Sequence, residues 1–362
     1  MGNRVVVTGL GCTSPLGNDV PTSWEACING QSGIDRITNF DPELYRCQIA
    51  GEIKNFVLPE IIPIKEAKKM DLFIQYSIAA TQEALNDSGL EITEDIQEEV
   101  GVSMGVGIGG LGCIEKYTKI LLESGPKRVS PFFIPMTLSN LAPGYVSLLF
   151  GAKNYTACTV SACTSSNHAI GTAARTIERG DAKVVIAGGA ESSVTPLGIA
   201  GFASMHALST RNDDPKRASR PFDKDRDGFV MGEGSGMLIL EEYEFAKARG
   251  ARIYCEITGY GFSSDAFHVT SPSAEGPARA MKMTLKDSGL AAEDIDYVNA
   301  HGTSTPVGDL NELKAIKMAF GEKAAQQISI SSTKSMTGHL LGAAAAIEAV
   351  FSIKALHHNF IP

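Results

Sequence analysis

Short runs of β-branched residues alternate along the chain with longer segments in which apolar residues recur at helical spacing. The short runs indicate strands and the longer segments indicate helices, because each spacing places the apolar side chains on one face of the element. Strands are predicted at 4–9, 183–189 and 327–332, and helices at 72–88, 163–179, 308–319 and 343–356. This alternation, with short Gly-rich loops, predicts an α/β protein with much parallel sheet.

A coarse repeat lies within this pattern. A strand leads to a chemically active residue at a helix start near 155–163, and the same arrangement recurs near 328–343. We therefore expect two similar halves, 1–250 and 251–362, divided near Gly250, where a charged helix ends and a new strand begins. The polar, Pro-broken stretch 211–229 is interpreted as a surface excursion.

Composition limits the class of protein. A chain of 362 residues that is 43% hydrophobic and 20% charged has the balance of a soluble globular protein of about two domains. Neither a signal segment nor an apolar stretch of about 18 residues is found, so we expect a cytoplasmic protein. The seven cysteines lack paired spacing, which disfavours a zinc site or a disulfide framework. The net charge of -9 disfavours nucleic-acid binding.

The segment 156–171, TACTVSACTSSNHAIG, contains the strongest candidate nucleophile. It runs from a strand into an amphipathic helix with Cys163 at the turn between them. Unpaired N–H groups and the helix dipole at that point would stabilise a thiolate and lower the thiol pKa. Position alone leaves a buried, inert cysteine as the alternative.

Two further blocks carry chemically active side chains at strand ends. In 296–309, an apolar strand ends in His301, and Thr303 and Thr305 follow it. In 328–350, Lys334 and His339 precede an Ala-rich helix that contains Glu348, a candidate partner for the lysine. A core histidine and a surface lysine are the ordinary alternatives. Together with Cys163, these side chains form a coherent set for covalent thioester chemistry.

Two other features have weaker interpretations. The segment 105–112, GVGIGGLG, fits G-x-G-x-x-G, but the acidic residue expected about 20 positions later is missing, so nicotinamide binding is disfavoured. We interpret this segment as close backbone packing, with Ile108 facing a pocket.

A basic cluster lies at a predicted helix start, where about one face carries Lys65, Lys68 and Lys69. With a second basic spot at Lys127 and Arg128, they form a candidate docking site for an acidic carrier, although a solvated helix face is the alternative.

Taken together, these residues resemble the β-ketoacyl-acyl-carrier-protein synthase II group of the thiolase-like condensing enzymes. The similarity runs from Val5 to Pro362 and includes VTGLGCTSPLGN at the start, GGAESSVTPLG at 188, ALSTRND at 207, RPFDKDRDGFVMGEG at 220, the cysteine segment and both histidine blocks. The resemblance implies a homodimer with a five-layered αβαβα core. It also implies decarboxylative Claisen condensation of an acyl chain with malonyl-acyl-carrier protein in fatty acid elongation, or else a ketosynthase subunit of a polyketide pathway.

The resemblance also implies roles for individual residues. Cys163 would be the acylated nucleophile, and His301 and His339 the catalytic pair. Lys334, tied to Glu348, would orient the site. The remaining implied contacts are Thr303 and Thr305 with the phosphopantetheine arm, and Ile108 and Phe202 with the acyl chain. The expected partners are acyl carrier protein and its acyl and malonyl thioesters, and no metal or redox cofactor is expected.

Three rival classes fit less well. Initiating ketosynthases that use coenzyme A pair their cysteine with His and Asn, whereas this chain has His339. Non-catalytic polyketide partners typically lack the cysteine, and a cysteine hydrolase would need only one histidine.

Two departures from the resemblance stand out. Ser166 occupies a position where many relatives have Gly, a change that we expect to be tolerated. The sequence ends at HHNFIP, whereas the family continues into a glycine-rich loop that supplies a second oxyanion donor. We therefore expect this sequence to be a piece of a longer protein, with slower acylation when tested alone.

Overall fold

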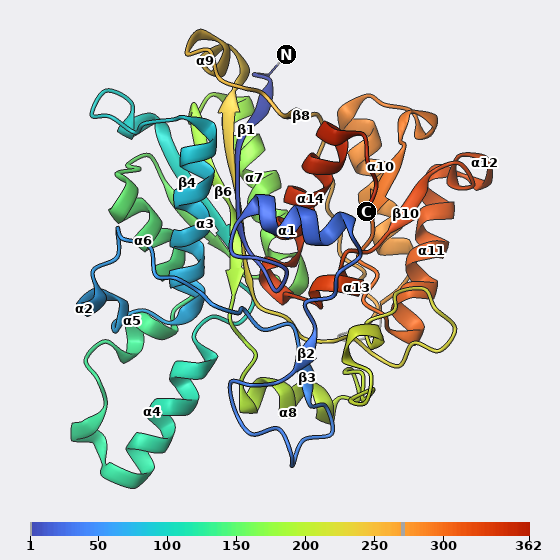
Figure 1. The fold of residues 1–362 in the computed structure, drawn as a ribbon. Helices are drawn as coiled ribbons and strands as arrows, with labels where there is room; N and C mark the ends of the chain where they lie inside the picture. The colour runs from blue at the N-terminus through green and yellow to red at the C-terminus, as the bar shows by residue number, and fades with distance from the viewer. Residues whose placement is uncertain (1, 269–271) are drawn as a thin grey trace.

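A six-stranded sheet forms the centre of the computed structural model, which describes residues 2–268 and 272–362 (Figure 1). β4 pairs in parallel with β5 and β6, whereas β7 runs antiparallel to both β6 and β1. In order across the sheet, the strands are β5 (Thr156–Thr159), β4 (Val100–Gly105), β6 (Val184–Glu191), β7 (Gly234–Glu242), β1 (Val5–Thr13) and β8 (Cys255–Ile257).

The prediction of much parallel sheet therefore holds for only one side of this sheet. The alternation of strands and helices indicates that both faces are covered, but it does not give strand direction. The long segment between β6 and β7 returns the chain antiparallel, without a simple crossover helix. All residues of β4 and β6 are buried, as expected for strands with helices on both faces.

Helices cover both faces of the sheet. α3 (Leu72–Ser88) and α6 (Leu141–Phe150) lie on one face, and α7 (Ser165–Arg179) and α14 (Ala344–His358) lie on the other (Figure 1). α3 packs directly on β1 because Gly11 has no side chain there. A Cβ at Gly11 would lie 1.9 Å from the carbonyl oxygen of Ala80.

Beyond α7 and α14 lies a second, two-stranded parallel sheet. It consists of β9 (Tyr297–Asn299) and β10 (Ser329–Ser331), with α10 (Glu275–Ser288) and α11 (Pro306–Phe320) beside it. Helices and sheets thus alternate across the molecule, which confirms the five-layered αβαβα prediction (Figure 1).

The expected repeat is visible at two turns. η3 (Ala162–Thr164) leads into α7, and η6 (Leu341–Ala343) leads into α14. Each turn contains or begins at a non-glycine residue with positive φ, Ala162 at 53° and Leu341 at 47°. β8, which follows residue 250, hydrogen-bonds to β1 of the first half, so the large sheet draws strands from both sides of the proposed boundary.

The predicted helices agree closely with the structure. The helix predicted at 72–88 has the bounds of α3, and the others differ by a few residues at their ends. None of the helices in the described part of the chain is long and apolar enough to cross a membrane. The remaining elements are α1 (Val20–Ile28), β2 (Asp35–Arg36), β3 (Ile49–Ala50), α2 (Ile64–Ala67), η1 (Gln97–Glu99), α4 (Leu111–Ser124), η2 (Pro126–Arg128), α5 (Phe133–Thr137), α8 (Pro196–Ser204), η4 (Pro215–Arg217), α9 (Tyr243–Ala248), η5 (Ala292–Asp294), α12 (Glu322–Ala325) and α13 (Lys334–Thr337).

Candidate active site

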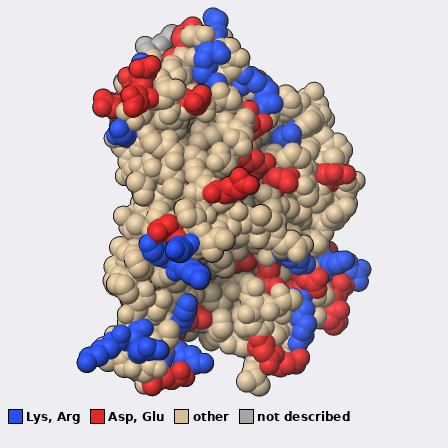
Figure 2. Space-filling model, turned by 60° about the vertical axis from the view of Figure 1, so that its left-hand side comes forward, with Lys and Arg blue, Asp and Glu red and all other residues tan. Residues whose placement is uncertain are grey.

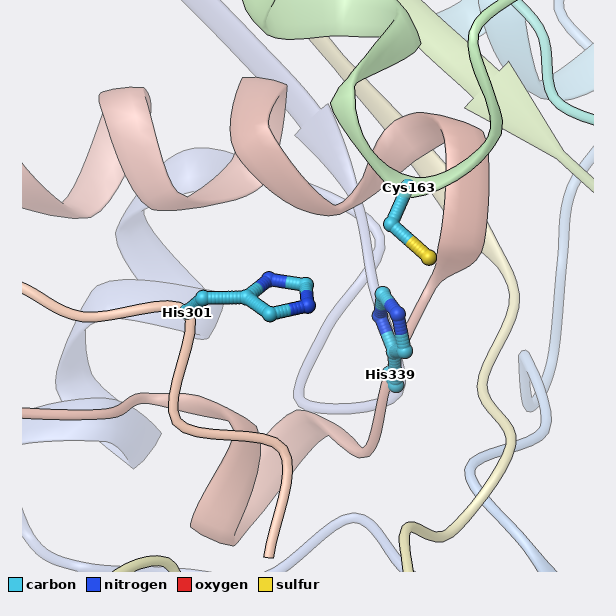
Figure 3. Close-up of side chains that lie close together, drawn as sticks. All are labelled: Cys163, His301 and His339. Carbon is cyan, nitrogen blue, oxygen red and sulfur yellow. The ribbon is translucent and has the colours of Figure 1, made fainter. Parts of the chain in front are cut away.

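The side chains of Cys163, His301 and His339 meet at one point (Figure 3). The Cys163 sulfur and one ring nitrogen from each histidine all lie within 4.8 Å of one another. The two imidazole rings are nearly perpendicular, with centroids 5.3 Å apart. Each residue lies between a strand or short helix and the next helix, so the repeat of the fold brings them together. Among residues 2–268 and 272–362, this is also the group of Cys, His and carboxylate side chains spaced closely enough to hold a metal ion.

The turn that carries Cys163 is held by hydrogen bonds. The N–H of Ser161 donates to the hydroxyl of Ser165 at 2.9 Å, and that hydroxyl donates to the carbonyl of Ala162 at 2.7 Å. Burial raises the pKa of the Cys163 thiol, and the charge of Lys334 and the local N–H only partly oppose that rise. The expected lowering of this pKa was therefore wrong, because removal from water outweighs the effect of the helix start.

His339 is fixed as one tautomer. The ring is almost completely buried, and its Nδ1 accepts the N–H of Leu341 at 3.3 Å, which places the ring proton on Nε2. Nε2 is buried and has no hydrogen-bond partner among the described residues. Burial and then the charge of Lys334 hold the pKa of His339 well below its usual range. The ring is therefore a neutral N–H donor with an unused proton beside Cys163.

The loop of His301 is held by a carboxylate that the sequence did not reveal. Glu312 on α11 accepts the backbone N–H groups of His301 at 2.6 Å and Gly302 at 2.7 Å. His301 is open to solvent on its cavity side, yet the surrounding protein and then Lys334 lower its pKa. Glu312 acts through backbone groups, so no side-chain pattern in the sequence pointed to it.

Lys334 and Glu348 form the predicted ion pair. The lysine side chain is 2% exposed, and its ammonium contacts the Glu348 carboxylate, which comes from α14. Burial raises the pKa of Glu348, and the Lys334 charge opposes this. The ammonium therefore has its counter-ion, and its charge adds to the effect of burial in lowering the pKa of both nearby histidines.

An open cavity of about 830 Å³ leads to the thiol. Thr303 and Thr305 both line it, and their hydroxyl oxygens lie 3.1 Å apart. Arg226 steadies this loop by donating to the carbonyls of Thr305 at 3.0 Å and Pro306 at 2.6 Å. The other lining residues are Ser161, Ala162, Cys163, Thr164, Ser264, Asp265, Ala266, Phe267, His268, Pro272, His301 and Gly308.

Phe202 and Ile108, the two residues implied in acyl binding, have different surroundings. Phe202 on α8 packs edge-on against Phe229 at 5.4 Å, and Phe229 packs edge-on against His339 at the same centroid distance. Ile108 is 38% exposed and is not among the residues that line the cavity leading to Cys163, so its contact with the acyl chain stays a prediction. Its loop is held instead by its backbone, because the N–H of Ile108 donates to Glu191 at 3.2 Å.

The basic residues do not share one helix face. α2 ends at Ala67 after a single turn, so Lys68 caps the helix and Lys69 lies beyond it. Lys69 pairs with Glu66 at 2.6 Å and lies over the Phe132 ring. Lys127 and Arg128 are exposed in η2, after α4. Figure 2 shows basic side chains gathered at mid-height on this side of the molecule and again at its lower end, the heights of α2 and α4.

Ser166 has a structural contact of its own. It is completely buried, and its hydroxyl accepts the N–H of Ala346 at 3.1 Å. This bond joins the first turns of α7 and α14, the two helices that follow Cys163 and His339. The serine at this position therefore serves the packing of the two halves.

The fold and this arrangement of a thiol with two imidazoles are those of a thiolase-like condensing enzyme. Residues 2–246 match the beta-ketoacyl synthase N-terminal domain and residues 254–362 match the C-terminal domain. The chain belongs to the beta-ketoacyl synthase family, as its sequence motifs predicted.

Similar proteins share most of its length. It is 53% identical over 361 residues to 3-oxoacyl-[acyl-carrier-protein] synthase 2 of Vibrio cholerae, covering 99% of this chain and 87% of that one. The Staphylococcus aureus protein of the same name is 53% identical over 351 residues, covering 96% and 84%. A beta-ketoacyl synthase structure from Burkholderia phymatum matches with a TM-score of 0.91 at 39% identity, covering 99% and 87%. A ketosynthase in complex with its type II polyketide synthase acyl-carrier protein matches at 0.88 and 33%, with the same coverage.

Proposed function

We propose that this protein joins an acyl chain carried on Cys163 to the two-carbon unit of malonyl-acyl-carrier protein, releasing carbon dioxide, in fatty acid elongation. The observation that carries the proposal is the meeting of a partly buried thiol with two imidazoles whose pKa values are lowered. One of these imidazoles, His339, has an N–H without a partner among the described residues. The 53% identity to proteins named 3-oxoacyl-[acyl-carrier-protein] synthase 2 supports it.

In the first step, the sulfur of Cys163 attacks the carbonyl carbon of an acyl thioester on the carrier. The thiol proton passes through an imidazole to the departing pantetheine sulfur, so an acyl-enzyme and a free carrier thiol result. The N–H of Cys163 lies at the turn and is a donor for the oxyanion that forms during the attack.

In the second step, malonyl-carrier loses carbon dioxide. The electron pair of the broken C–C bond enters the thioester, and the enolate oxygen receives hydrogen bonds from His339 Nε2 and from His301. Neutral rings suit this task because an N–H donor stabilises the developing charge without first losing a proton. The enolate carbon then attacks the acyl carbonyl, a C–C bond forms, and the bond to the Cys163 sulfur breaks.

The cavity suits a substrate delivered on an arm. Thr303 and Thr305 offer paired hydroxyls to the pantetheine chain on the path to Cys163. The acidic carrier would be attracted by the basic residues Lys65, Lys68, Lys69, Lys127 and Arg128. The steps involve no change of oxidation state and every charge has a hydrogen-bond donor, so the reaction requires no metal or redox cofactor.

We also propose a cytoplasmic setting and a homodimer, and one feature supports each. All seven cysteines are free, and the reaction needs Cys163 as a free thiol, which suits the reducing cytoplasm. β5 is an edge strand of the large sheet, partly exposed, and its open edge is a site where a second copy would form the homodimer. A polyketide role is the weaker alternative, because the ketosynthase found with a polyketide carrier is 33% identical rather than 53%.

The test is to incubate the protein with acyl-carriers of graded length and malonyl-carrier, and to identify products by mass. The proposal predicts a β-ketoacyl-carrier two carbons longer than each accepted primer, with none formed by Cys163→Ala. Formation of free acid from the acyl-carrier, without a longer product, would instead identify a hydrolase.

A further inference from the structure

Glu191, the last residue of β6, is completely buried and forms no ion pair in the described part of the chain. Its carboxylate instead accepts hydrogen bonds from four backbone N–H groups and one hydroxyl. The donors are Gly107 at 2.9 Å, Ile108 at 3.2 Å, Gly109 at 3.2 Å, Gly342 at 3.1 Å and the Ser193 hydroxyl at 3.2 Å. Burial raises the pKa of Glu191, and these hydrogen bonds partly oppose that rise.

This carboxylate explains the G-x-G-x-x-G segment. In a dinucleotide-binding protein, successive N–H groups of such a loop hold a phosphate. Here the N–H groups of Gly107, Ile108 and Gly109 hold Glu191. The loop is an anion site whose occupant is a side chain of the same protein.

The same carboxylate reaches the turn beside His339. Gly342 belongs to η6, and the N–H of its neighbour Leu341 donates to His339 Nδ1. The two segments touch at Glu191, since a Cβ on Gly342 would lie 2.1 Å from the Gly107 nitrogen and 2.8 Å from Glu191 Oε2. Glu191 therefore joins the loop after β4 to the residues that orient His339.

We propose that Glu191 is a positioning residue for condensation: it fixes the Leu341–Ala343 turn, and through it the tautomer and ring orientation of His339. The inference rests on the proposed function, because it assigns His339 to the step that follows acylation of Cys163. Glu191 itself touches no reacting atom.

Glu191→Gln should break part of this hydrogen-bond network, because the two carboxylate oxygens of Glu191 accept from different donors. Oε1 accepts from Gly109 and Ser193, Oε2 accepts from Gly107 and Gly342, and Ile108 is shared. Whichever oxygen becomes NH₂ then faces N–H groups that need an acceptor, and the loop or the turn must move. Glu191→Asp keeps both oxygens and the charge, so it retains part of the cradle.

A matched control lies in the same sheet. Glu241 is also completely buried, but it pairs with Val184 at the opposite end of β6 and binds Arg249 and Thr8. Glu241→Gln therefore removes a buried carboxylate of the sheet far from His339, and it reports any general loss of stability.

The experiment measures single-turnover condensation on wild type, Glu191→Gln, Glu191→Asp and Glu241→Gln. Each enzyme is first acylated from acyl-carrier, the acylated fraction is counted by mass, and malonyl-carrier is then added. We expect Glu191→Gln to acylate Cys163 but to condense about 100-fold more slowly per acylated site. Glu191→Asp should lie between it and wild type, and Glu241→Gln should condense at the wild-type rate per acylated site.

Nitrogen-15 NMR of labelled histidine gives a second readout. Wild type should show His339 as the Nε2–H form, and Glu191→Gln should show mixed tautomers, a change that loss of stability alone would not cause. Equal condensation rates per acylated site in wild type and Glu191→Gln, or equal losses in Glu191→Gln and Glu241→Gln, would overturn the inference. If Glu191→Gln does not fold, Glu191→Asp is compared with Glu241→Gln by the same criteria. A wild type that acylates but does not condense would overturn the proposed function itself.

Discussion

The pKa of the Cys163 thiol reflects two opposing influences, burial and nearby positive charge. Burial raises its pKa, and the ammonium of Lys334 and the local N–H oppose this without reversing it. For the nearby histidines, the surrounding protein and then the charge of Lys334 lower the pKa and favour the neutral ring. The environment thus favours the neutral form of all three side chains.

The pH dependence of thiol alkylation tests this resting state. Because the pKa of Cys163 lies above its ordinary value of about 9, the rate of its reaction with iodoacetamide should still be rising at pH 9. The site of modification is confirmed by peptide mass. A rate that levels off near neutral pH would show a stabilised thiolate and contradict the burial argument.

Lys334 should contribute to the stability of the folded protein through its ion pair with Glu348. Lys334→Met leaves the buried Glu348 without its counter-ion and should cost about 3–5 kcal/mol in the free energy of unfolding at neutral pH. Burial raises the pKa of Glu348, so the folded variant binds a proton more tightly than the unfolded chain does. That protonation offsets the loss at low pH, and the cost should grow as the pH rises.

Denaturant unfolding at fixed protein concentration, at pH 5 and pH 8, measures both effects. The control is Lys334→Met combined with Glu348→Leu, which removes both charges and should recover most of the stability. If the single and double variants unfold alike, the pair has no such energetic role.

At the level of helices and strands, the sequence predicted part of this site. Cys163, His301 and His339 were predicted because each is a reactive side chain at a strand or loop that leads to a helix, and the fold gathers these junctions. The bounds of α3 followed from apolar spacing. Strand direction did not follow, because burial on both faces has the same pattern in parallel and antiparallel strands.

Residues that act through backbone groups escaped prediction. Glu191 and Glu312 bind N–H groups, which every residue except proline carries, so no partner side chain marks them in the sequence. The lysines near residue 65 were placed on one helix face because their spacing suits a helix, yet α2 ends after one turn. Sequence alone did not show that the backbone of Ile108 is held by Glu191.

The basic residues around α2 nevertheless allow a test of carrier docking. Lys65→Glu, Lys68→Glu and Lys69→Glu together should raise the KM for carrier-bound substrate about 10-fold and weaken its salt dependence, because steering by charge is lost. Small thioester substrates should react as before.

The control reverses the same number of charges elsewhere. Lys282 and Lys286 on α10 and Lys323 in α12 are exposed on the other side of the molecule (Figure 1). Their replacement by Glu should leave the KM nearly unchanged. An equal rise in both triple variants would point to net charge rather than to a docking site.

At the scale of the whole molecule, the candidate site lies where the segment that matches the N-terminal domain meets the segment that matches the C-terminal domain. Cys163 lies in the turn before α7, and His339 lies in the turn before α14. The hydrogen bond between Ser166 and Ala346 joins the two helices. The proposed nucleophile and the proposed hydrogen-bond donors to the enolate thus come from segments that match different domains of the family. Their relative placement depends on the packing between those segments.

In the proposed reaction, one acyl chain passes from the Cys163 sulfur to the malonyl carbon. This transfer can be followed by loading the enzyme from acyl-carrier, removing all carriers, adding malonyl-carrier in a single turnover, and analysing the products by mass spectrometry. We predict that the acyl mass sits on the peptide containing Cys163, disappears after the addition, and reappears in an equal amount of β-ketoacyl-carrier. Acyl mass on another cysteine, or its release as free acid without a longer product, would rule out this transfer.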